Sequence, residues 1–146
     1  MVSAGAAGPI KVAIVDDSEL VATSLQRVLR GESDIDIVGT AGNAFDALEL
    51  ARDHALDVVV MDFQLGSDDG IETSARLMEH RPEARVVILT GGMPDRGMLM
   101  RARSAGCVGF VAKTSDIHGT LADIVRSAHV GTLRLDGGPT PTSPTL

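Results

Sequence analysis

The sequence of 146 residues predicts an α/β protein built on a doubly wound, five-stranded parallel sheet. Five short apolar runs alternate along the chain with segments whose apolar residues recur at helical spacing. This alternation is typical of a parallel sheet that helices cover on both faces through right-handed crossovers. Four of the runs also lead into a polar residue at the sheet edge where ligands gather in such proteins. A chain of this length fits one compact domain.

The first two strand–helix units follow from apolar runs and capping residues. The run Lys11–Val15 predicts a buried strand, and the segment 18–31 predicts a helix that begins at a serine N-cap and ends at a glycine. A second, shorter strand is predicted at Ile35–Val38. An asparagine cap then opens a helix over residues 43–54.

Three further units complete the predicted sheet. Each again joins an apolar run to an amphipathic segment, with glycine or proline at the boundaries. The predicted strands are Val58–Asp62, Arg85–Thr90 and Cys107–Val111, and the predicted helices are 71–80, 95–105 and a last one marked by apolar residues from Ile117 to Ala128.

The two ends of the chain differ from the middle. Residues 1–10 are mostly small and predict a flexible N-terminus, and residues 11–130 form the predicted domain. Residues 131–146 hold three of the six prolines and few apolar side chains, too few to offset the entropy lost on ordering. We expect this segment to be a flexible tail or linker.

Composition argues against several classes of function. Twenty acidic and thirteen basic residues give a formal net charge of −7, which opposes non-specific binding to nucleic acid or anionic lipid. The single cysteine, Cys107, cannot form an internal disulfide and fits a reducing compartment. The apolar stretches are too short to span a membrane, and the N-terminus lacks the features of a signal peptide. We expect a soluble cytoplasmic domain that itself contacts neither DNA nor membrane.

Polar residues of a particular kind follow four of the predicted strands. Asp16 and Asp17 follow the first strand, Asp62 ends the third, Thr90 ends the fourth, and Lys113 lies just past the fifth. Taken singly, such aspartates cap helices, such a threonine forms turns, and such a lysine is a solvated charge. Taken together, the three carboxylates repel one another unless a cation joins them, and oxygen ligands favour Mg²⁺ over Zn²⁺. The set suits in-line phosphoryl transfer to a carboxylate, in which the lysine and the threonine bind phosphoryl oxygens.

Four motifs carry a resemblance to a known family. They are Val-Asp-Asp at 15–17, Val-Met-Asp-Phe-Gln-Leu-Gly-Ser-Asp-Asp-Gly at 60–70, Ile-Leu-Thr-Gly-Gly at 88–92 and Gly-Phe-Val-Ala-Lys-Thr at 109–114. Through these motifs, residues 11–130 resemble the receiver domain of bacterial two-component response regulators. The resemblance implies a flavodoxin/CheY-like (βα)5 fold with strand order 2-1-3-4-5. It also implies that Asp62 takes a phosphoryl group from a sensor histidine kinase, with no enzymatic activity beyond self-phosphorylation and self-dephosphorylation.

The same resemblance implies a role for each site residue. Mg²⁺ would be held directly by Asp17 and Asp62, mainly through water by Asp16, and by the backbone carbonyl of Gln64. Lys113 would complete the site as the cation that binds the phosphoryl group.

A switch is also implied by the resemblance. On phosphorylation Thr90 would move toward the phosphoryl group and Phe110 would turn inward, which would remodel the face made by the fourth helix, fifth strand and fifth helix. A plain core role for Phe110 fits the sequence equally well. The chain departs from the family at Gly66, where proline is usual, and glycine there predicts a more mobile loop after Asp62.

Several readings of the output stay open. The Gly-Phe-Val-Ala-Lys-Thr segment resembles receivers of the NarL/FixJ (LuxR-type) group, which implies a C-terminal helix-turn-helix DNA-binding domain outside this chain, and a homodimer is possible. A free-standing receiver that acts in a phosphorelay or by protein–protein interaction is the alternative. A haloacid-dehalogenase-like phosphatase fits less well, because its nucleophile follows the first strand in an Asp-x-Asp pattern. A receiver that never takes phosphate is disfavoured by the complete set of site residues.

Overall fold

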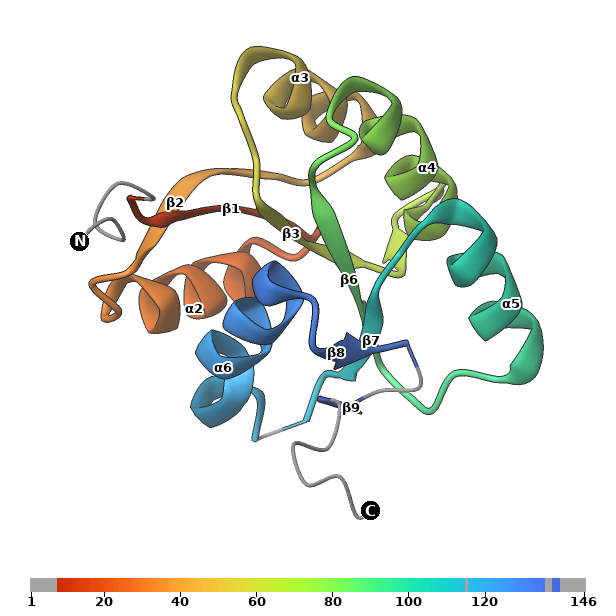
Figure 1. Ribbon diagram of the computed structural model, residues 1–146. Coiled ribbons are helices and arrows are strands. Elements are labelled where there is room, and N and C mark those ends of the chain that lie inside the picture. Colours follow the sequence, from red (N-terminus) through yellow and green to blue (C-terminus); the bar gives the residue numbers. More distant parts are fainter. Residues whose placement is uncertain (1–7, 115, 136–137, 140–146) are drawn as a thin grey trace.

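The computed structural model describes residues 8–114, 116–135 and 138–139. Its centre is a parallel sheet of five strands in the order β2-β1-β3-β6-β7, and helices lie on both faces (Figure 1). Counted along the chain this order is 2-1-3-4-5, so the predicted fold class and topology are confirmed. The strands of the sheet are β1 (Ile10–Val15), β2 (Ile35–Ala41), β3 (Val58–Asp62), β6 (Arg85–Thr90) and β7 (Gly109–Ala112), and the helices are α2 (Glu19–Arg30), α3 (Ala44–Asp53), α4 (Gly70–His80), α5 (Arg96–Ala105) and α6 (Ile117–Val130).

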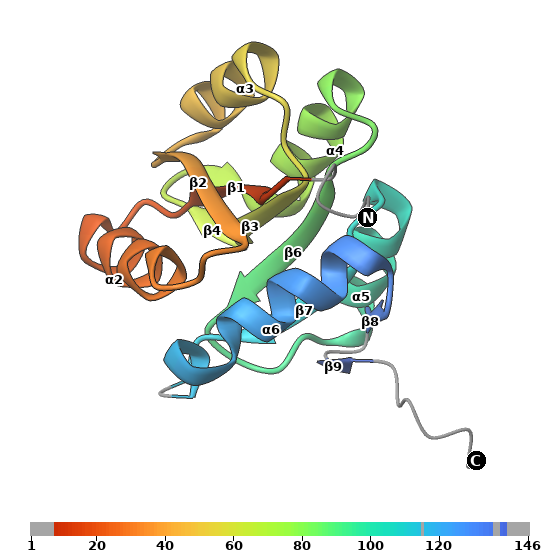
Figure 2. The same cartoon turned by 60° about the vertical axis from the view of Figure 1, so that its left-hand side comes forward.

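The helices divide between the two faces of the sheet. Helices α3, α4 and α5 pack on one face, and α2 and α6 pack on the other, as Figures 1 and 2 both show. Strand β3 serves both cores, because Val59 and Met61 point into the first and Val58 and Val60 into the second. All of its residues are buried. A strand covered on both faces has to be apolar throughout, which explains why the run was recognisable in the sequence.

Side-chain caps begin four of the five helices of the sheet layers. The oxygens of Ser18, Asn43, Asp69 and Asp95 each accept a hydrogen bond from a backbone N–H in the first turn of the helix that follows. These bonds satisfy amide groups that have no partner inside the helix. They also set where the chain leaves each strand end, and therefore where the polar residues of that edge lie.

Two predicted strand boundaries are wrong. The last strand of the sheet begins at Gly109 and not at Cys107, because Cys107 N donates to Ala102 O at the end of α5. Strand β2 continues to Ala41, beyond the predicted end at Val38. The structure also has two short antiparallel pairs that the sequence did not predict, β4 (Gln64–Leu65) with β5 (Asp68–Asp69), and β8 (Leu133–Arg134) with β9 (Gly138–Pro139).

The chain ends lie largely outside the described residues. Residues 1–7, 136–137 and 140–146 are not described, so flexibility of 1–10 and of 131–146 stays a prediction. Within the second segment, Leu133 is buried against the core under α2 and α6. Among the residues that the structure describes, no helix is long and apolar enough to cross a membrane.

Arg126 on α6 ties that helix to the loop between α2 and β2. Its guanidinium donates two hydrogen bonds to Asp34, of 2.8 and 2.9 Å, and also pairs with Glu32 and Asp123. The hydrogen bond from Arg126 is the main reason why the pKa of Asp34 lies below its ordinary value of 3.8. The paired form of Asp34 is therefore the charged one.

We expect Arg126→Gln to lower the free energy of unfolding slightly at neutral pH and not at all in strong acid. Because the folded-state pKa of Asp34 is depressed, its contribution to stability is present above the ordinary pKa of 3.8 and disappears as pH falls through the folded value. Urea unfolding of parent and variant at a series of pH values measures this difference. The matched control is Arg30→Gln on α2, and a difference that persisted at the acid end would contradict the assignment.

Candidate functional site

Three carboxylates meet at the carboxyl edge of the sheet, as the sequence predicted. Asp16 follows β1 and Asp62 ends β3, and these strands are neighbours with Val15 opposite Met61. Asp16, Asp17 and Asp62 each offer a carboxylate oxygen, and these oxygens lie within 4.8 Å of one another. Asp16 and Asp62 are buried while Asp17 is exposed, so the cluster opens to solvent on one side.

Lys113 reaches this cluster from the end of β7, the outer strand of the sheet beyond β6. The residue follows β7, and its backbone N–H donates to Thr90 O at 2.8 Å. Its Nζ lies 3.1 Å from Asp16 Oδ2 and 3.1 Å from Asp62 Oδ1. Burial alone would lower the pKa of Lys113, but the hydrogen bonds that it donates to Asp16 and Asp62 and the charges of these carboxylates outweigh burial, and the pKa lies above its ordinary value. The ammonium group is therefore charged at neutral pH.

Burial, hydrogen bonding and neighbouring charge act on the pKa of Asp62 in opposite directions. Burial raises the pKa of the Asp62 carboxyl, the hydrogen bond from Lys113 opposes that shift, and the charge of Asp16 adds to it. The pKa lies above its ordinary value of 3.8. One lysine thus leaves the charge of the buried aspartates incompletely compensated.

The donor atoms fit a hard divalent cation. Asp16 Oδ2 is buried, and its partner among the described residues is the Lys113 ammonium at 3.1 Å, which it shares with Asp62. A buried carboxylate oxygen in this state is costly unless a further positive group reaches it. The ligands are all oxygens and one side is open to water, which is the environment that Mg²⁺ prefers.

A cleft of about 370 Å³ lies over the cluster. It is large enough for a phosphoryl group and its water. Its walls are formed by Asp17, Asp62, Phe63, Gln64, Gly66, Gly91 and Lys113.

The short β4–β5 hairpin forms one wall of this cleft. Gln64 is paired with Asp69, and the turn between the two strands places Gly66 at a φ of +62°. The hairpin closes where Gly70 N donates to Phe63 O at 2.8 Å. A Cβ on Gly70 would lie 2.0 Å from the backbone oxygen of Asp62, so only glycine allows the chain to return this close to the phosphoacceptor candidate.

We expect Gly66→Pro, which would restore the residue usual in the family, to destabilise this protein. Proline requires a φ near about −65°, whereas Gly66 has a φ of +62°. We expect a loss of about 1–3 kcal/mol in the free energy of unfolding, measured by urea denaturation. Gly66→Asn is the control, because asparagine tolerates a positive φ and should leave the turn in place. A Gly66→Pro variant as stable as the parent would contradict the geometry of this turn.

The remaining predicted site residues lie close by but in different settings. Thr90 is buried on β6, one position beyond Leu89, which is the register partner of Asp62. Gln64 lines the cleft from the hairpin. Phe110 is already buried, 2% exposed, within the core under α3, α4 and α5. An inward turn of Phe110 would therefore start from another orientation than the one in this structure.

Two contacts near the site were not predicted from the sequence. Asp68 accepts a hydrogen bond from Ala44 N at the start of α3, and Asp69 pairs with Arg101 of α5. Hydrogen bonds from Arg101 and from the helix amides more than offset burial and hold the pKa of Asp69 below its ordinary value. No periodicity in the sequence joins Arg101 on α5 to the loop that holds Asp69, so the sequence did not indicate this pair.

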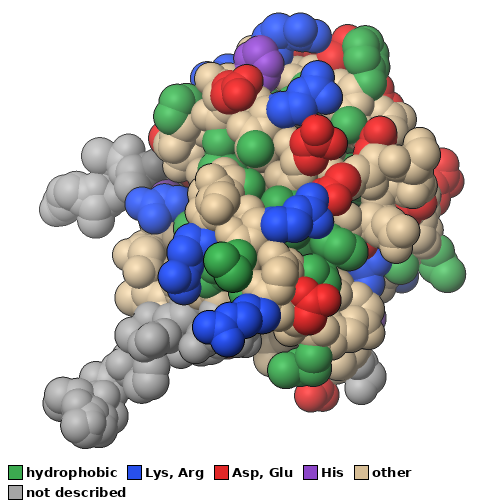
Figure 3. All heavy atoms as spheres, turned by 90° about the vertical axis from the view of Figure 1, so that its right-hand side faces the viewer, with side chains coloured by type: hydrophobic (Ala, Val, Ile, Leu, Met, Phe, Trp, Pro, Cys, Tyr) green, Lys and Arg blue, Asp and Glu red, His purple; other side chains and the backbone are tan. Residues whose placement is uncertain are grey.

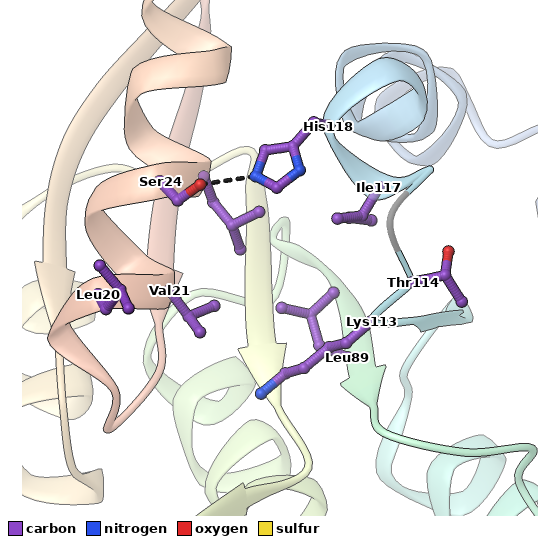
Figure 4. Close-up of a pocket in the computed structure, with 9 residues that line it drawn as sticks. Leu20, Val21, Ser24, Leu89, Lys113, Thr114, Ile117 and His118 are labelled. Carbon is purple, nitrogen blue, oxygen red and sulfur yellow. Dashed lines mark hydrogen bonds between the residues drawn. The ribbon is translucent and has the colours of Figure 1, made fainter.

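A second cavity lies on the other side of Lys113. It has a volume of about 250 Å³, lies between α2 and α6, and has mostly apolar walls (Figure 4). Ser24 Oγ and His118 Nε2 are hydrogen-bonded at 2.6 Å across it. Figure 4 shows the side chain of Lys113 running along its floor beside Leu89. The apolar stem of Lys113 thus packs here while its ammonium group reaches the carboxylates.

Comparisons with known proteins show which family this chain belongs to. A family model described as the response regulator receiver domain matches residues 12–125. Over 121 residues the chain is 32% identical to the response regulator protein VraR of Staphylococcus saprophyticus, covering 83% of this chain and 57% of the relative. It is also 32% identical over 140 residues to a protein-glutamate methylesterase/protein-glutamine glutaminase of Caulobacter vibrioides, covering 92% of this chain and 41% of that protein. The chain therefore spans about half the length of these curated relatives.

Solved structures give the same result. A two-component response regulator of the LuxR family from Aurantimonas superposes with a TM-score of 0.79 at 26% identity, over 88% of this chain and 91% of that one. A response regulator protein from Burkholderia pseudomallei, solved with a phosphorylated aspartic acid, a calcium ion and citrate, superposes with a TM-score of 0.67 at 29% identity, over 77% of this chain and 65% of that one. With the receiver-domain model matching residues 12–125, the chain belongs to the family of response regulator receiver domains.

Proposed function

We propose that this chain is a phosphorylation-controlled receiver. Asp62 accepts a phosphoryl group from a sensor histidine kinase, and the transfer depends on Mg²⁺. The observation that carries the proposal is the meeting of Asp62 with Asp16, Asp17 and the Lys113 ammonium at one open edge of the sheet. The relative from Burkholderia pseudomallei carries a phosphorylated aspartic acid, which supports the same chemistry here.

Each residue of the site has a separate role in the transfer. An Asp62 carboxylate oxygen attacks phosphorus, an O–P bond forms, and the N–P bond of the phosphohistidine breaks with its electron pair left on the imidazole. Lys113 stabilises negative charge on a phosphoryl oxygen, and the Thr90 hydroxyl donates to another. Bound Mg²⁺ would neutralise charge between the carboxylates and the phosphoryl group, held by Asp17, Asp62, the Gln64 carbonyl and, through water, Asp16.

Incubation with acetyl phosphate tests this proposal without the kinase. We expect the intact mass of the protein to rise by one phosphoryl group when Mg²⁺ is present, and not to rise when a chelator removes it. Labelling that proceeds equally well in the presence of the chelator would overturn the metal dependence. Absence of any labelling with acetyl phosphate and with beryllofluoride would overturn the proposal as a whole.

For the output, we propose that Thr90 and Phe110 relay the phosphorylated state to the face of α5, β7 and α6 in a cytoplasmic regulator that forms a homodimer. A helix-turn-helix DNA-binding domain beyond this chain is supported by the likeness to a LuxR-family regulator. The methylesterase among the relatives is equally similar, so a receiver of this kind serves more than one output. Neither output requires turnover of an external substrate by this chain. Reading the gene beyond Leu146 distinguishes a DNA-binding output from a free-standing receiver.

A further inference from the structure

The β4–β5 hairpin beside Asp62 is held from outside by two helices. On one side Asp68 Oδ2 accepts a hydrogen bond of 3.0 Å from Ala44 N, the first residue of α3. On the other side Asp69 Oδ2 lies 2.6 Å from Arg101 Nη2 of α5. The second carboxylate oxygen of Asp69 caps α4 through Ile71 N and Glu72 N. Asp69 therefore joins three elements, the hairpin, α4 and α5.

The contact between Arg101 and Asp69 lies on an exposed face of mixed charge. Figure 3, which views the side of α4 and α5, shows basic and acidic side chains next to one another there. The Arg101 side chain is 50% exposed and that of Asp69 is 33% exposed. A surface ion pair of this kind contributes little to global stability. Its importance depends on what moves when it breaks.

The element that would move is the one that carries a proposed metal ligand. Asp69 is the register partner of Gln64, whose backbone N–H lies 3.5 Å from Asp62 Oδ1. The turn contains Gly66, which restricts the backbone less than any other residue. A hairpin with a permissive turn needs outside contacts to keep its carbonyl groups in one place, and Arg101 provides such a contact.

We propose that Arg101 is a positioning residue, which through Asp69 holds the hairpin so that the Gln64 carbonyl faces the carboxylates, and that α5 and cation binding at Asp62 are thereby coupled. The inference rests on the proposed function, since it concerns the Mg²⁺ site of that function. Coupling of this kind is reciprocal, so a partner that shifts α5 changes the affinity for Mg²⁺, and Mg²⁺ changes the affinity for that partner.

The sign of the effect separates positioning from simple electrostatics. Arg101→Gln removes a positive charge near the carboxylates, and Coulomb attraction alone would then make Mg²⁺ bind more tightly. Positioning predicts the opposite, an affinity weaker by about two- to fivefold, the range expected for loss of an exposed ion pair. Calorimetric titration of the 146-residue chain with MgCl₂ measures the dissociation constant directly.

Four further variants complete the experiment. Asp69→Asn keeps a capping side chain and loses the ion pair, and it is expected to weaken Mg²⁺ binding by a similar factor. The double variant, which has no net change in charge, is expected to bind no more weakly than either single variant, because both remove the same contact. Arg103→Gln on the same helix is the charge-matched control and is expected to bind Mg²⁺ at least as tightly as the parent. Arg101→Lys is expected to restore most of the affinity.

The outcomes distinguish this inference from the proposed function. If the parent binds Mg²⁺ and Arg101→Gln binds it as tightly or more tightly, the positioning role is wrong and the proposed function stands. The same conclusion follows if Arg101→Gln lowers only the melting temperature, or if Arg103→Gln weakens binding equally. If the parent itself binds no Mg²⁺, both the inference and the metal dependence of the proposed function are wrong.

Discussion

Asp62→Asn is expected to abolish labelling by acetyl phosphate while the protein stays folded. The amide has the size of the carboxylate but cannot form an acyl phosphate, so the loss should be complete. Intact-mass spectrometry after incubation with acetyl phosphate and Mg²⁺ measures it. Asp36→Asn, an exposed aspartate on β2, is the control and should be labelled like the parent.

Unfolding does not explain such a loss, because the substitution is expected to stabilise the metal-free protein. Burial raises the pKa of Asp62, so the folded state binds its proton more tightly than the unfolded state does. The stability of the parent therefore falls as pH rises from the ordinary value of 3.8 through the higher folded value, and asparagine removes this cost. We expect a gain of about 0.5–2 kcal/mol at neutral pH without Mg²⁺. Undiminished labelling of Asp62→Asn would mean that another residue accepts the phosphoryl group.

The sheet and its reactive edge were predictable because both follow from short-range patterns. Strand β3 is buried on both faces, which demands an unbroken apolar run, and parallel strands bring their carboxyl ends to one edge. Asp16, Asp62 and Lys113 could therefore be placed together from their positions after separate strands. The start of the last strand was less predictable, since Cys107 and Val108 are as apolar as the residues of β7 and differ only in their backbone partners.

The contacts around the hairpin could not be predicted from the sequence, for a different reason. Asp69 and Arg101 are 32 residues apart, on elements whose relative position depends on how α4 and α5 pack. A surface ion pair leaves no apolar periodicity, and charged residues are common on helix surfaces. The positive φ of Gly66 likewise depends on the pairing of Gln64 with Asp69, which has no signature of its own in so short a hairpin. The structure shows this loop paired as a hairpin, and the greater mobility that Gly66 predicts for it stays a prediction.

Lys113→Met is expected to separate metal binding from phosphoryl transfer. Methionine keeps the apolar stem that packs beside Leu89 and removes the ammonium group that lies 3.1 Å from both Asp16 and Asp62. Without that competing cation, the carboxylates should bind Mg²⁺ more tightly than in the parent. The rate of labelling by acetyl phosphate should nevertheless fall by about 10²–10³, because the charge that stabilises the phosphoryl oxygens is gone.

Stability gives an independent measure of the same electrostatics. Loss of one partner of a fully buried ion pair costs about 3–5 kcal/mol, and exposure of 28% of the Lys113 side chain should reduce the cost to about 1–3 kcal/mol. Saturating Mg²⁺ should recover most of this loss, so the metal raises the melting temperature of Lys113→Met more than that of the parent. Lys11→Met is the control, because Lys11 is the only other lysine of the chain and is exposed on β1. Weaker Mg²⁺ binding in Lys113→Met would contradict this competition. It would show that the lysine organises the carboxylates for the cation.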